Sequence, residues 1–171
     1  MTTIAEATKN DCESLSSLAK QTFIESHGNS ASAEDVSSYI TEKYSNEAIK
    51  IELADPKNIY HIIYHNTDAA GYSKIILNSP YTNSPLQNIT KLERLYLQER
   101  FYDQKLGLRL LDFIINLTKG HDQAGIWLYT WKENQRAINF YKKNGFEIIG
   151  SYDFPISNTH SNPNHQMFLK F

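Results

Sequence analysis

The sequence has very little cysteine, since Cys12 is the only one among 171 residues. A single cysteine cannot form an internal disulfide, which favours a reducing, cytoplasmic compartment. Cys12 falls in the expected first helix. Free cysteine most often serves there as a small packing residue, so we interpret it as part of the core and not as a nucleophile.

Long apolar runs are also absent, and neither sign of charge dominates. No run approaches the length of a membrane span, and no basic segment followed by an apolar one opens the chain. The 17 Lys and Arg residues nearly balance the 19 Asp and Glu residues, giving a net charge of −2 and a pI near 6.3. The sequence therefore predicts no secretion, no membrane partner and no nucleic-acid partner.

Recognisable metal sites and hydrolase triads are missing as well. The six histidines show no metal-ligand spacing, and His160 with His165 in one polar segment is too little for a site. No Ser-His-Asp or Cys-His arrangement can be read from the chain. The sequence therefore supports neither a metal centre nor a hydrolase mechanism.

The composition, 40% hydrophobic and 21% charged, is that of an ordinary globular protein, and the length fits one domain over residues 1–171. Helical and strand patterns alternate along the chain, which predicts an α/β fold. The expected strands cover 2–7, 59–65, 70–77, 91–97, 125–131, 146–152 and 166–171. The expected helices cover 10–23, 32–44, 106–117 and 134–144, with a turn or helix at 47–53. Two polar segments, 78–90 and 157–165, are expected to be loops, and a loop as long as the first often serves a site.

The segment from residue 125 to residue 146 is the most informative part of the chain. Residues 125–131 are rich in β-branched and aromatic side chains, which predicts a buried strand. A helix follows, for which Asn134 is a good N-cap and Gly145 a good left-handed C-cap. Tyr141 lies on the apolar face of this helix, where it could be a packing residue or a functional one.

A second block consists of an expected strand at 91–97, a short loop and an expected helix at 106–117. Such a junction presents backbone N–H groups and the positive end of a helix dipole, which suits a pyrophosphate. Alternation places two sets of side chains on opposite faces of the strand, namely Leu92, Arg94 and Tyr96 against Glu93, Leu95 and Leu97. Taken alone, the block also fits an ordinary amphipathic helix after a strand.

Together the two blocks resemble the GNAT family of N-acetyltransferases. In that family the pattern Asn-x-x-Ala-x-x-Phe-Tyr-x-x-x-Gly-Phe marks the helix beside the acetyl-CoA thiol. This chain matches the pattern with Asn134, Ala137, Phe140, Tyr141, Gly145 and Phe146. Within the family the similarity is greatest to PaiA-type polyamine acetyltransferases, through residues 92–97, 126–128, 131–146 and 21–23. The resemblance implies a central, mostly antiparallel mixed sheet of six to seven strands flanked by about four helices.

The family's pyrophosphate loop, Arg/Gln-x-x-Gly-x-Gly/Ala, is altered in this chain. Aligned from the strand, its positions fall on Tyr102, Lys105 and Gly107, and only Gly107 keeps the family residue. An alignment that starts at Gln104 recovers the first glycine but places Arg109 at the last position. Lys105 could obstruct the close approach of a phosphate or meet it as a point charge.

The resemblance implies that acetyl-CoA binds to residues of the two blocks. The residues concerned are Leu95, Tyr96, Leu97, Tyr102, Asp103, Gln104, Lys105, Leu106, Gly107, Leu108, Asn134, Ala137, Phe140 and Tyr141. The acetyl group would pass directly to an amine, with Tyr141 protonating the departing thiolate. Glu93 would accept the amine proton directly or through water, or would be an inert partner of Arg94. A strand N–H, that of Leu95 or Leu97, would hold the oxyanion.

The acceptor is the least defined part of the expectation. Tyr39, Trp131, Tyr72 and Tyr81, with the 78–90 loop, could form an aromatic pocket for a cationic amine, or could be core residues. The leading hypothesis is an N-acetyltransferase for a small primary amine, with polyamines ahead of a peptide amine. The alternative is an acetyl-CoA-binding regulatory module that has lost turnover through its altered loop. The resemblance to the family also implies a possible homodimer.

Overall fold

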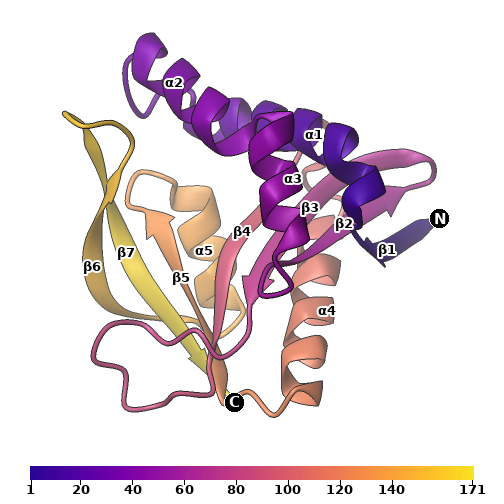
Figure 1. The fold of residues 1–171 in the computed structure, drawn as a ribbon. Coiled ribbons are helices and arrows are strands. Elements are labelled where there is room, and N and C mark those ends of the chain that lie inside the picture. The colour runs from indigo at the N-terminus through magenta and orange to yellow at the C-terminus, as the bar shows by residue number, and fades with distance from the viewer.

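The computed structural model describes all 171 residues and is built on one seven-stranded sheet (Figure 1). The strands are β1 (Thr2–Glu6), β2 (Ile59–His65), β3 (Asp68–Ile76), β4 (Thr90–Leu97), β5 (Gly125–Trp131), β6 (Glu147–Pro155) and β7 (Ser161–Lys170). In space they follow the order β1-β2-β3-β4-β5-β7-β6, and every neighbouring pair is antiparallel except β4 and β5. The expected α/β fold with a mixed, mostly antiparallel sheet is confirmed.

Five α-helices cover the two faces of this sheet. They are α1 (Cys12–His27), α2 (Ala33–Tyr44), α3 (Asn46–Ala54), α4 (Leu106–Gly120) and α5 (Gln135–Lys143). The segment expected as a turn or helix forms α3, whose first turn is capped by Ser45 Oγ accepting from the Ala48 N–H at 3.2 Å. None of the five combines the length and hydrophobicity needed to cross a bilayer.

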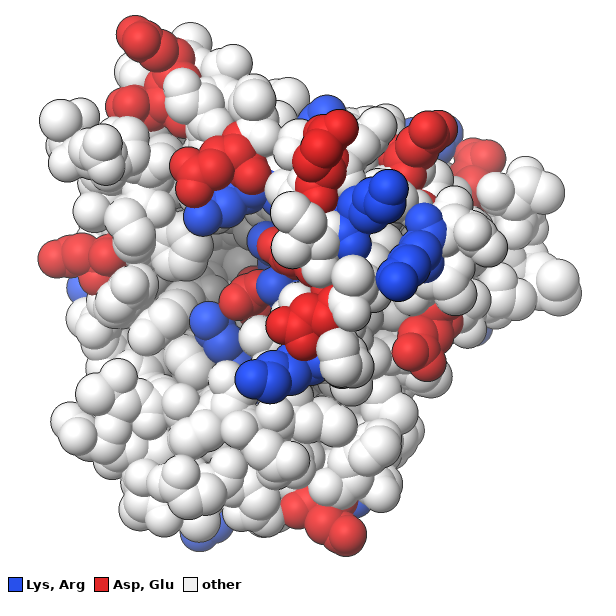
Figure 2. Space-filling view, viewed as in Figure 1, with Lys and Arg blue, Asp and Glu red and all other residues white.

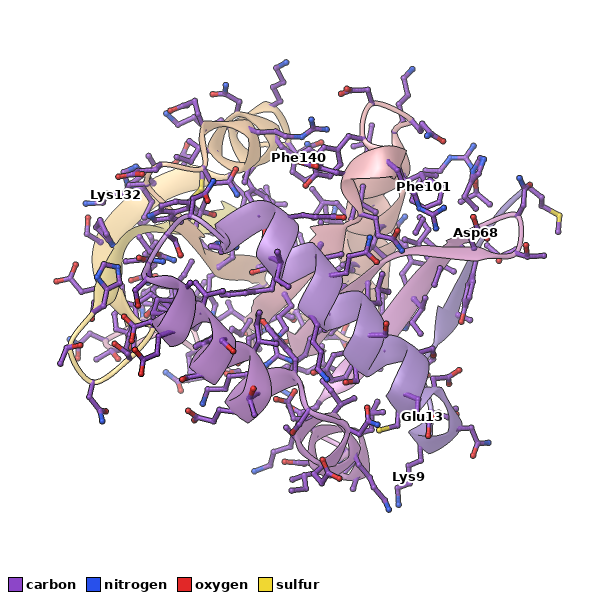
Figure 3. All side chains as sticks on the ribbon, turned by 90° about the horizontal axis from the view of Figure 1, so that it is seen from above. Lys9, Glu13, Asp68, Phe101, Lys132 and Phe140 are labelled. Carbon is purple, nitrogen blue, oxygen red and sulfur yellow. The ribbon has the colours of Figure 1, made fainter.

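Each face of the sheet has its own hydrophobic core. Helices α1 to α3 pack on one face, around side chains that include Leu15, Phe23, Tyr44, Tyr60 and Ile62. Helices α4 and α5 pack on the other, around side chains that include Ile75, Leu110, Ile114, Leu128 and Met167. Figure 3 shows Phe101 and Phe140 on the α4 side and Lys9 and Glu13 on the opposite side. Burying each Leu or Ile contributes about 1.5–3 kcal/mol, so the two cores hold the helices to the sheet.

The capping residues predicted for α5 are confirmed. Asn134 Oδ1 accepts from the Ala137 N–H at 3.1 Å, which satisfies one of the free donors of the first turn. Gly145 has a φ of +87°, the left-handed conformation that ends the helix and turns the chain into β6. Local sequence therefore sets both ends of this helix.

The β6–β7 hairpin is longer than the sequence predicted. Its turn contains only residues 156–160, whereas 157–165 was expected to be a loop. In the structure Asn162 and Asn164 pair with Phe154 and Tyr152 across the hairpin, and both asparagines are buried. The prediction was wrong because these polar side chains line a cavity, so the β7 end lacks the hydrophobic alternation that marks a strand.

Strand β4 contains a bulge that the sequence pattern did not reveal. Lys74 pairs with Arg94 and Ile75 pairs with Leu92, which leaves Glu93 as an extra residue on β4. An extra residue reverses the facing of every side chain beyond it. The expected alternation is therefore wrong across the bulge, because Leu92 packs with the α4 core whereas Arg94 lies on the α1–α3 face.

Strands β4 and β5 pair only at their beginnings. The paired residues are Thr90 with Ile126 and Lys91 with Trp127. The Gln98 N–H donates to Ala70 on β3 at 2.9 Å. Because successive N–H groups of a strand point to opposite edges, those of Leu95 and Leu97 point away from β3 and into the gap beside β5.

Candidate active site

The gap between β4 and β5 opens into a cavity of about 1150 Å³ that reaches both faces of the sheet. Figure 2 shows a hollow on the surface with basic and acidic side chains at its border. We call one part the cofactor half; it is lined by Leu95, Leu97, residues of the 102–108 segment and α5. We call the other part the acceptor half; it is lined by α1 to α3, by Lys74, Glu93 and Arg94, and by the adjoining ends of β5 to β7.

The start of α4 forms one wall of the cofactor half. None of the backbone N–H groups of Leu106, Gly107 and Leu108 has a partner in the protein, and no side chain caps the helix. Free donors at the positive end of a helix dipole form an anion-binding site of the kind that a pyrophosphate needs. Of the residues expected here, Tyr102, Asp103 and Lys105 also line the cavity, whereas Gln104 turns outward and donates to Arg100 O.

Lys105 has the backbone conformation that glycine most often supplies. Its φ is 60° and its ψ is 12°, in the left-handed region. The lysine therefore keeps the sharp turn that leads into α4, and its side chain lies at the rim of the cavity. The change from the family glycine alters the charge of this loop and preserves its shape.

Arg136 is a second cation of the cofactor half, and the sequence analysis missed it. Its guanidinium lies over the Tyr102 ring at 3.7 Å and pairs with Asp103 at 3.3 Å. A cation in the first turn of a helix is unfavourable to the helix dipole. The position of Arg136 in the first turn was therefore a signal in the sequence, because a cation at that position is favoured where an anion binds.

Helix α5 supplies the opposite wall of the cofactor half with Asn134, Ala137, Phe140 and Tyr141. The Tyr141 ring packs edge-on against Phe146 at 5.3 Å, and burial raises the pKa of its phenol well above the ordinary value. No protein group is hydrogen-bonded to its hydroxyl. Tyr141 is therefore a neutral phenol whose O–H remains available inside the cavity.

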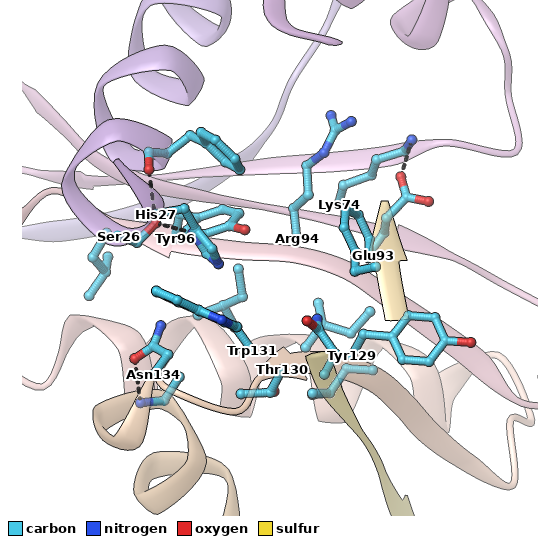
Figure 4. Close-up of a pocket in the computed structure, with 18 of the residues that line it drawn as sticks. Ser26, His27, Lys74, Glu93, Arg94, Tyr96, Tyr129, Thr130, Trp131 and Asn134 are labelled. Atoms are coloured by element: carbon cyan, nitrogen blue, oxygen red, sulfur yellow. Dashed lines mark hydrogen bonds and ion pairs between the residues drawn. The ribbon is translucent and has the colours of Figure 1, made fainter. Parts of the chain in front are cut away.

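A network of ion pairs forms the floor of the acceptor half. Arg94 donates two hydrogen bonds to Glu52, each 3.1 Å long, and Lys74 lies 2.8 Å from the same carboxylate. Lys74 also contacts Glu93, as the dashed line in Figure 4 shows, and Lys91 lies 3.2 Å from Glu93. Because Lys74 and Arg94 are buried, this network fixes their positions.

The two carboxylates of this floor are held in the ionised form. Burial alone would raise the pKa of Glu93, but Lys74, Lys91 and Arg94 together lower it to about 2. The pKa of Glu52 is likewise lowered, because Arg94 and Lys74 outweigh its burial. Glu93 is therefore a poorer proton acceptor than the sequence suggested, since its charge is already bound by two ammonium groups.

His27 lies over the gap from the α1 side, and the sequence analysis gave it no role. Figure 4 shows it beside Tyr96 and facing Trp131, with ring centroids 5.9 Å and 5.6 Å away. Its Nδ1 lies 2.7 Å from Ser26 Oγ. Burial lowers the pKa of the imidazole to about 4, so the ring is neutral at pH 7. The sequence predicted this helix to end at Phe23, whereas α1 extends to His27, so no signal in the sequence marked this residue.

The aromatic residues proposed for the acceptor fall into two groups. Tyr39 and Trp131 line the acceptor half. Tyr72 is fully buried beneath it, and Tyr81 lies outside the cavity, packed against Trp127 at 5.8 Å. The 78–89 loop folds along β5, where the Trp127 indole N–H donates to Ser79 O at 2.7 Å, so it does not form the pocket wall that we expected.

Comparison with known proteins points to one family. The model of the acetyltransferase (GNAT) family matches residues 14–146, more than half of the chain. An uncharacterized N-acetyltransferase of Lactobacillus delbrueckii subsp. lactis is 23% identical over 88% of this chain and 87% of its own length. A spermidine N(1)-acetyltransferase of Thermoplasma acidophilum is 26% identical over 81% of this chain and 83% of its own length.

Solved structures share the fold. The crystal structure of the PaiA N-acetyltransferase from Thermoplasma acidophilum, in complex with coenzyme A, superposes with a TM-score of 0.80 at 22% identity. The superposition covers 100% of this chain and 99% of that one. The ribosomal-protein-S18-alanine N-acetyltransferase from Escherichia coli superposes with a TM-score of 0.73 at 15% identity, over 99% and 94% of the two chains.

Proposed function

Because the chain belongs to the acetyltransferase (GNAT) family, we propose that it transfers the acetyl group of acetyl-CoA to the primary amine of a small molecule. One observation carries this proposal: a single cavity connects the free N–H groups of α4 with the neutral phenol of Tyr141 and the gap beside β4. An anion site, a proton donor and strand N–H donors are the three protein groups that acyl transfer from a thioester requires.

The residues of the cofactor half fit acetyl-CoA. The N–H groups of residues 106–108 would bind the pyrophosphate, with Lys105 and Arg136 adding positive charge. The exposed edge of β4 would pair with the amide groups of the pantetheine arm in the manner of an added strand. Asn134 can serve as helix cap and ligand together, because only its Oδ1 is used by the helix.

The catalytic roles follow from the two faces of the gap. The Leu95 or Leu97 N–H would hold the oxygen of the tetrahedral intermediate, since both point into the gap. Tyr141, which packs in the core of the α4 face, would give its proton to the departing thiolate. The amine would approach from the opposite, α1–α3 face, where the acceptor half lies. Glu93 would act there chiefly as a fixed negative charge.

Polyamines are the first acceptors to assay. Two relatives are named as polyamine acetyltransferases, the spermidine N(1)-acetyltransferase of Thermoplasma acidophilum and a spermine/spermidine N(1)-acetyltransferase of Bacillus subtilis. The Bacillus subtilis protein is 26% identical over 63% of this chain and 74% of its own length. The rings of Tyr39 and Trp131 and the carboxylates of Glu52 and Glu93 supply groups that attract an ammonium. Lys74, Lys91 and Arg94 oppose these carboxylates, so only a short polyamine segment is expected to enter.

The test combines binding and turnover in one preparation. Calorimetric titration with acetyl-CoA is expected to give one site per chain, followed by thiol release with spermidine, spermine, short diamines and peptide amines. Thiol release on no acceptor, with normal acetyl-CoA binding, would contradict the enzyme and support the regulatory module. Absence of acetyl-CoA binding would contradict both.

We also propose a cytoplasmic location and a homodimeric state. A single cysteine suits a reducing cytoplasm, and the family habit of pairing suggests a homodimer. Strand β6 is a free edge of the sheet, and Ile148, Ile149 and Tyr152 on it are 41–43% exposed. An uncovered apolar edge of this kind favours self-association. Light scattering at several concentrations measures the oligomeric state.

A further inference from the structure

We infer that His27 is the group that accepts the proton of the attacking amine, an assignment that rests on the proposed acetyl transfer. His27 comes from the last turn of α1, on the face of the sheet opposite to Tyr141. It contacts Tyr96 on β4 and Trp131 on β5, so it spans the open part of the gap between the two strands.

The position of His27 relative to the gap supports this role. The N–H groups of Leu95 and Leu97, on either side of Tyr96, point into the gap toward the expected thioester carbonyl. His27 lies against Tyr96 itself, on the α1 side. An amine that reached the carbonyl from the acceptor half would therefore pass the imidazole, while the thiolate would leave toward Tyr141 on the other side.

The hydrogen bonds of Ser26 fix the tautomer of His27. Ser26 Oγ lies 2.8 Å from Thr22 O, and a carbonyl can only accept, so the Ser26 proton points to Thr22. Toward His27, the same oxygen must then accept, which places a proton on Nδ1. The neutral ring consequently carries its free lone pair on Nε2, and Nε2 has no hydrogen-bond partner in the protein.

The other bases of the acceptor half are carboxylates that are already paired, including the exposed Glu42, which lies 2.9 Å from Lys43. Glu52 accepts from Arg94, Lys74 and Tyr60, and Glu93 is bound by Lys74 and Lys91. The phenols of Tyr39 and Tyr44 have pKa values raised chiefly by burial, so they are protonated donors. Only burial acts on the pKa of His27, lowering it to about 4, and no neighbouring charge contributes. A low pKa keeps the Nε2 lone pair unprotonated at neutral pH.

The transfer then balances in atoms and charge. The neutral amine donates its lone pair to the carbonyl carbon and forms the C–N bond, while the carbonyl electron pair moves to oxygen. The nitrogen becomes acidic as that bond forms, and its proton passes to Nε2 of His27. The C–S bond breaks, the carbonyl reforms, and the sulfur takes the proton of Tyr141. His27 releases a proton to solvent and Tyr141 regains one, leaving an acetylated amine and a free thiol.

Two variants of the full-length protein test the inference. His27→Phe keeps an aromatic ring packed against Phe23 and removes the Nε2 lone pair. In this variant kcat on the best amine is expected to fall about 100-fold, while the Kd for acetyl-CoA stays unchanged. His27→Ala leaves space for an added base. Imidazole is expected to restore part of its activity, whereas pyrazole, of the same shape but far weaker basicity, is not. His121→Gln, at an exposed residue beyond α4, is the matched control.

Nitrogen NMR of the wild-type protein adds a reading that does not depend on turnover, and it is expected to show the proton of His27 on Nδ1. A proton on Nε2, an unchanged kcat in His27→Phe, or equal rescue by pyrazole overturns the inference. If wild-type protein acetylates no amine, the proposed function fails and this role fails with it. If wild type is active and His27→Phe matches it, only the role of His27 is lost.

Discussion

The two halves of the cavity recognise their ligands with different parts of the protein. In the cofactor half the recognition groups are backbone N–H groups left free by α4 and by the edge of β4. In the acceptor half they are side chains, and the charged ones are already paired with each other. A backbone site keeps its function through side-chain changes such as glycine to lysine at position 105. A side-chain site changes its specificity with each substitution.

The largest expected effect comes from Tyr141→Phe, which removes a buried hydroxyl that has no hydrogen-bond partner in the protein and lines the cavity. We expect kcat to fall by about 100-fold or more, because the thiolate then leaves without a proton donor. The Kd for acetyl-CoA, measured by calorimetry, should stay the same, since backbone groups dominate binding. Tyr64→Phe, on β2 and outside the cavity, is the control. Unchanged kcat in Tyr141→Phe would remove the acid role.

Glu52→Gln tests how strongly the acceptor half depends on its charge pairing. The change leaves the buried cations Arg94 and Lys74 without their shared carboxylate, so the free energy of unfolding should fall by about 3 kcal/mol. Denaturant titration measures this. Glu42→Gln, whose exposed pair with Lys43 contributes little, should change stability by less than about 1 kcal/mol. Equal effects of the two changes would show that the buried network is not a structural unit.

The pH dependence of stability sharpens the same contrast. The folded-state pKa of Glu93 is lowered to about 2, below its unfolded value near 4.3. The ionised Glu93 therefore contributes at most about 3 kcal/mol to the free energy of unfolding. This contribution is present above pH 4.3 and is lost as the pH falls toward 2. Unfolding measured between pH 6 and pH 3 should show a shallower loss in Glu93→Gln than in wild type. Glu147→Gln, at an exposed position on β6, should follow the wild-type curve.

The smallest expected effect is on the affinity of the cofactor half for acetyl-CoA. Lys105→Glu places a negative charge beside the free N–H groups of α4, and the Kd for acetyl-CoA should rise about 10-fold at low salt and less at high salt. Lys57→Glu, a charge reversal at an exposed turn, is the control. An unchanged Kd would show that the Lys105 side chain points away from the phosphates. Lys105→Gly should leave affinity within a few-fold, because it keeps the loop conformation.

The parts of the molecule that the sequence predicted are those with local causes. The strand at 125–131, the cap at Asn134 and the turn at Gly145 follow from propensity and capping within a few residues. The bulge at Glu93 has no such cause, because it depends on the register between β3 and β4. A regular alternation therefore put Leu92 on the same face as Arg94, although the two side chains lie on opposite faces of the sheet.

The acceptor half was harder to predict for the same reason. Its residues come from eight different helices and strands, so no spacing along the chain indicates them. Tyr81 was expected there because it lies in a long loop, yet that loop packs against β5. His27 has no metal-ligand spacing in the sequence, and the two features that distinguish it, its burial and its hydrogen bond with Ser26, exist only in the folded chain.

The two-pair junction between β4 and β5 also divides the protein mechanically. Strands β1 to β4 form one continuous ladder and β5 to β7 another, and strand pairing between them is limited to Thr90–Ile126 and Lys91–Trp127. The rest of the connection is side-chain packing on both faces, through the α4 core on one face and through contacts such as His27 with Trp131 and Tyr39 with Phe154 on the other. A ligand arm bound along β4 completes the interrupted ladder, so cofactor binding should turn two loosely coupled cooperative units into one, detectable as shared hydrogen-exchange protection across the seam.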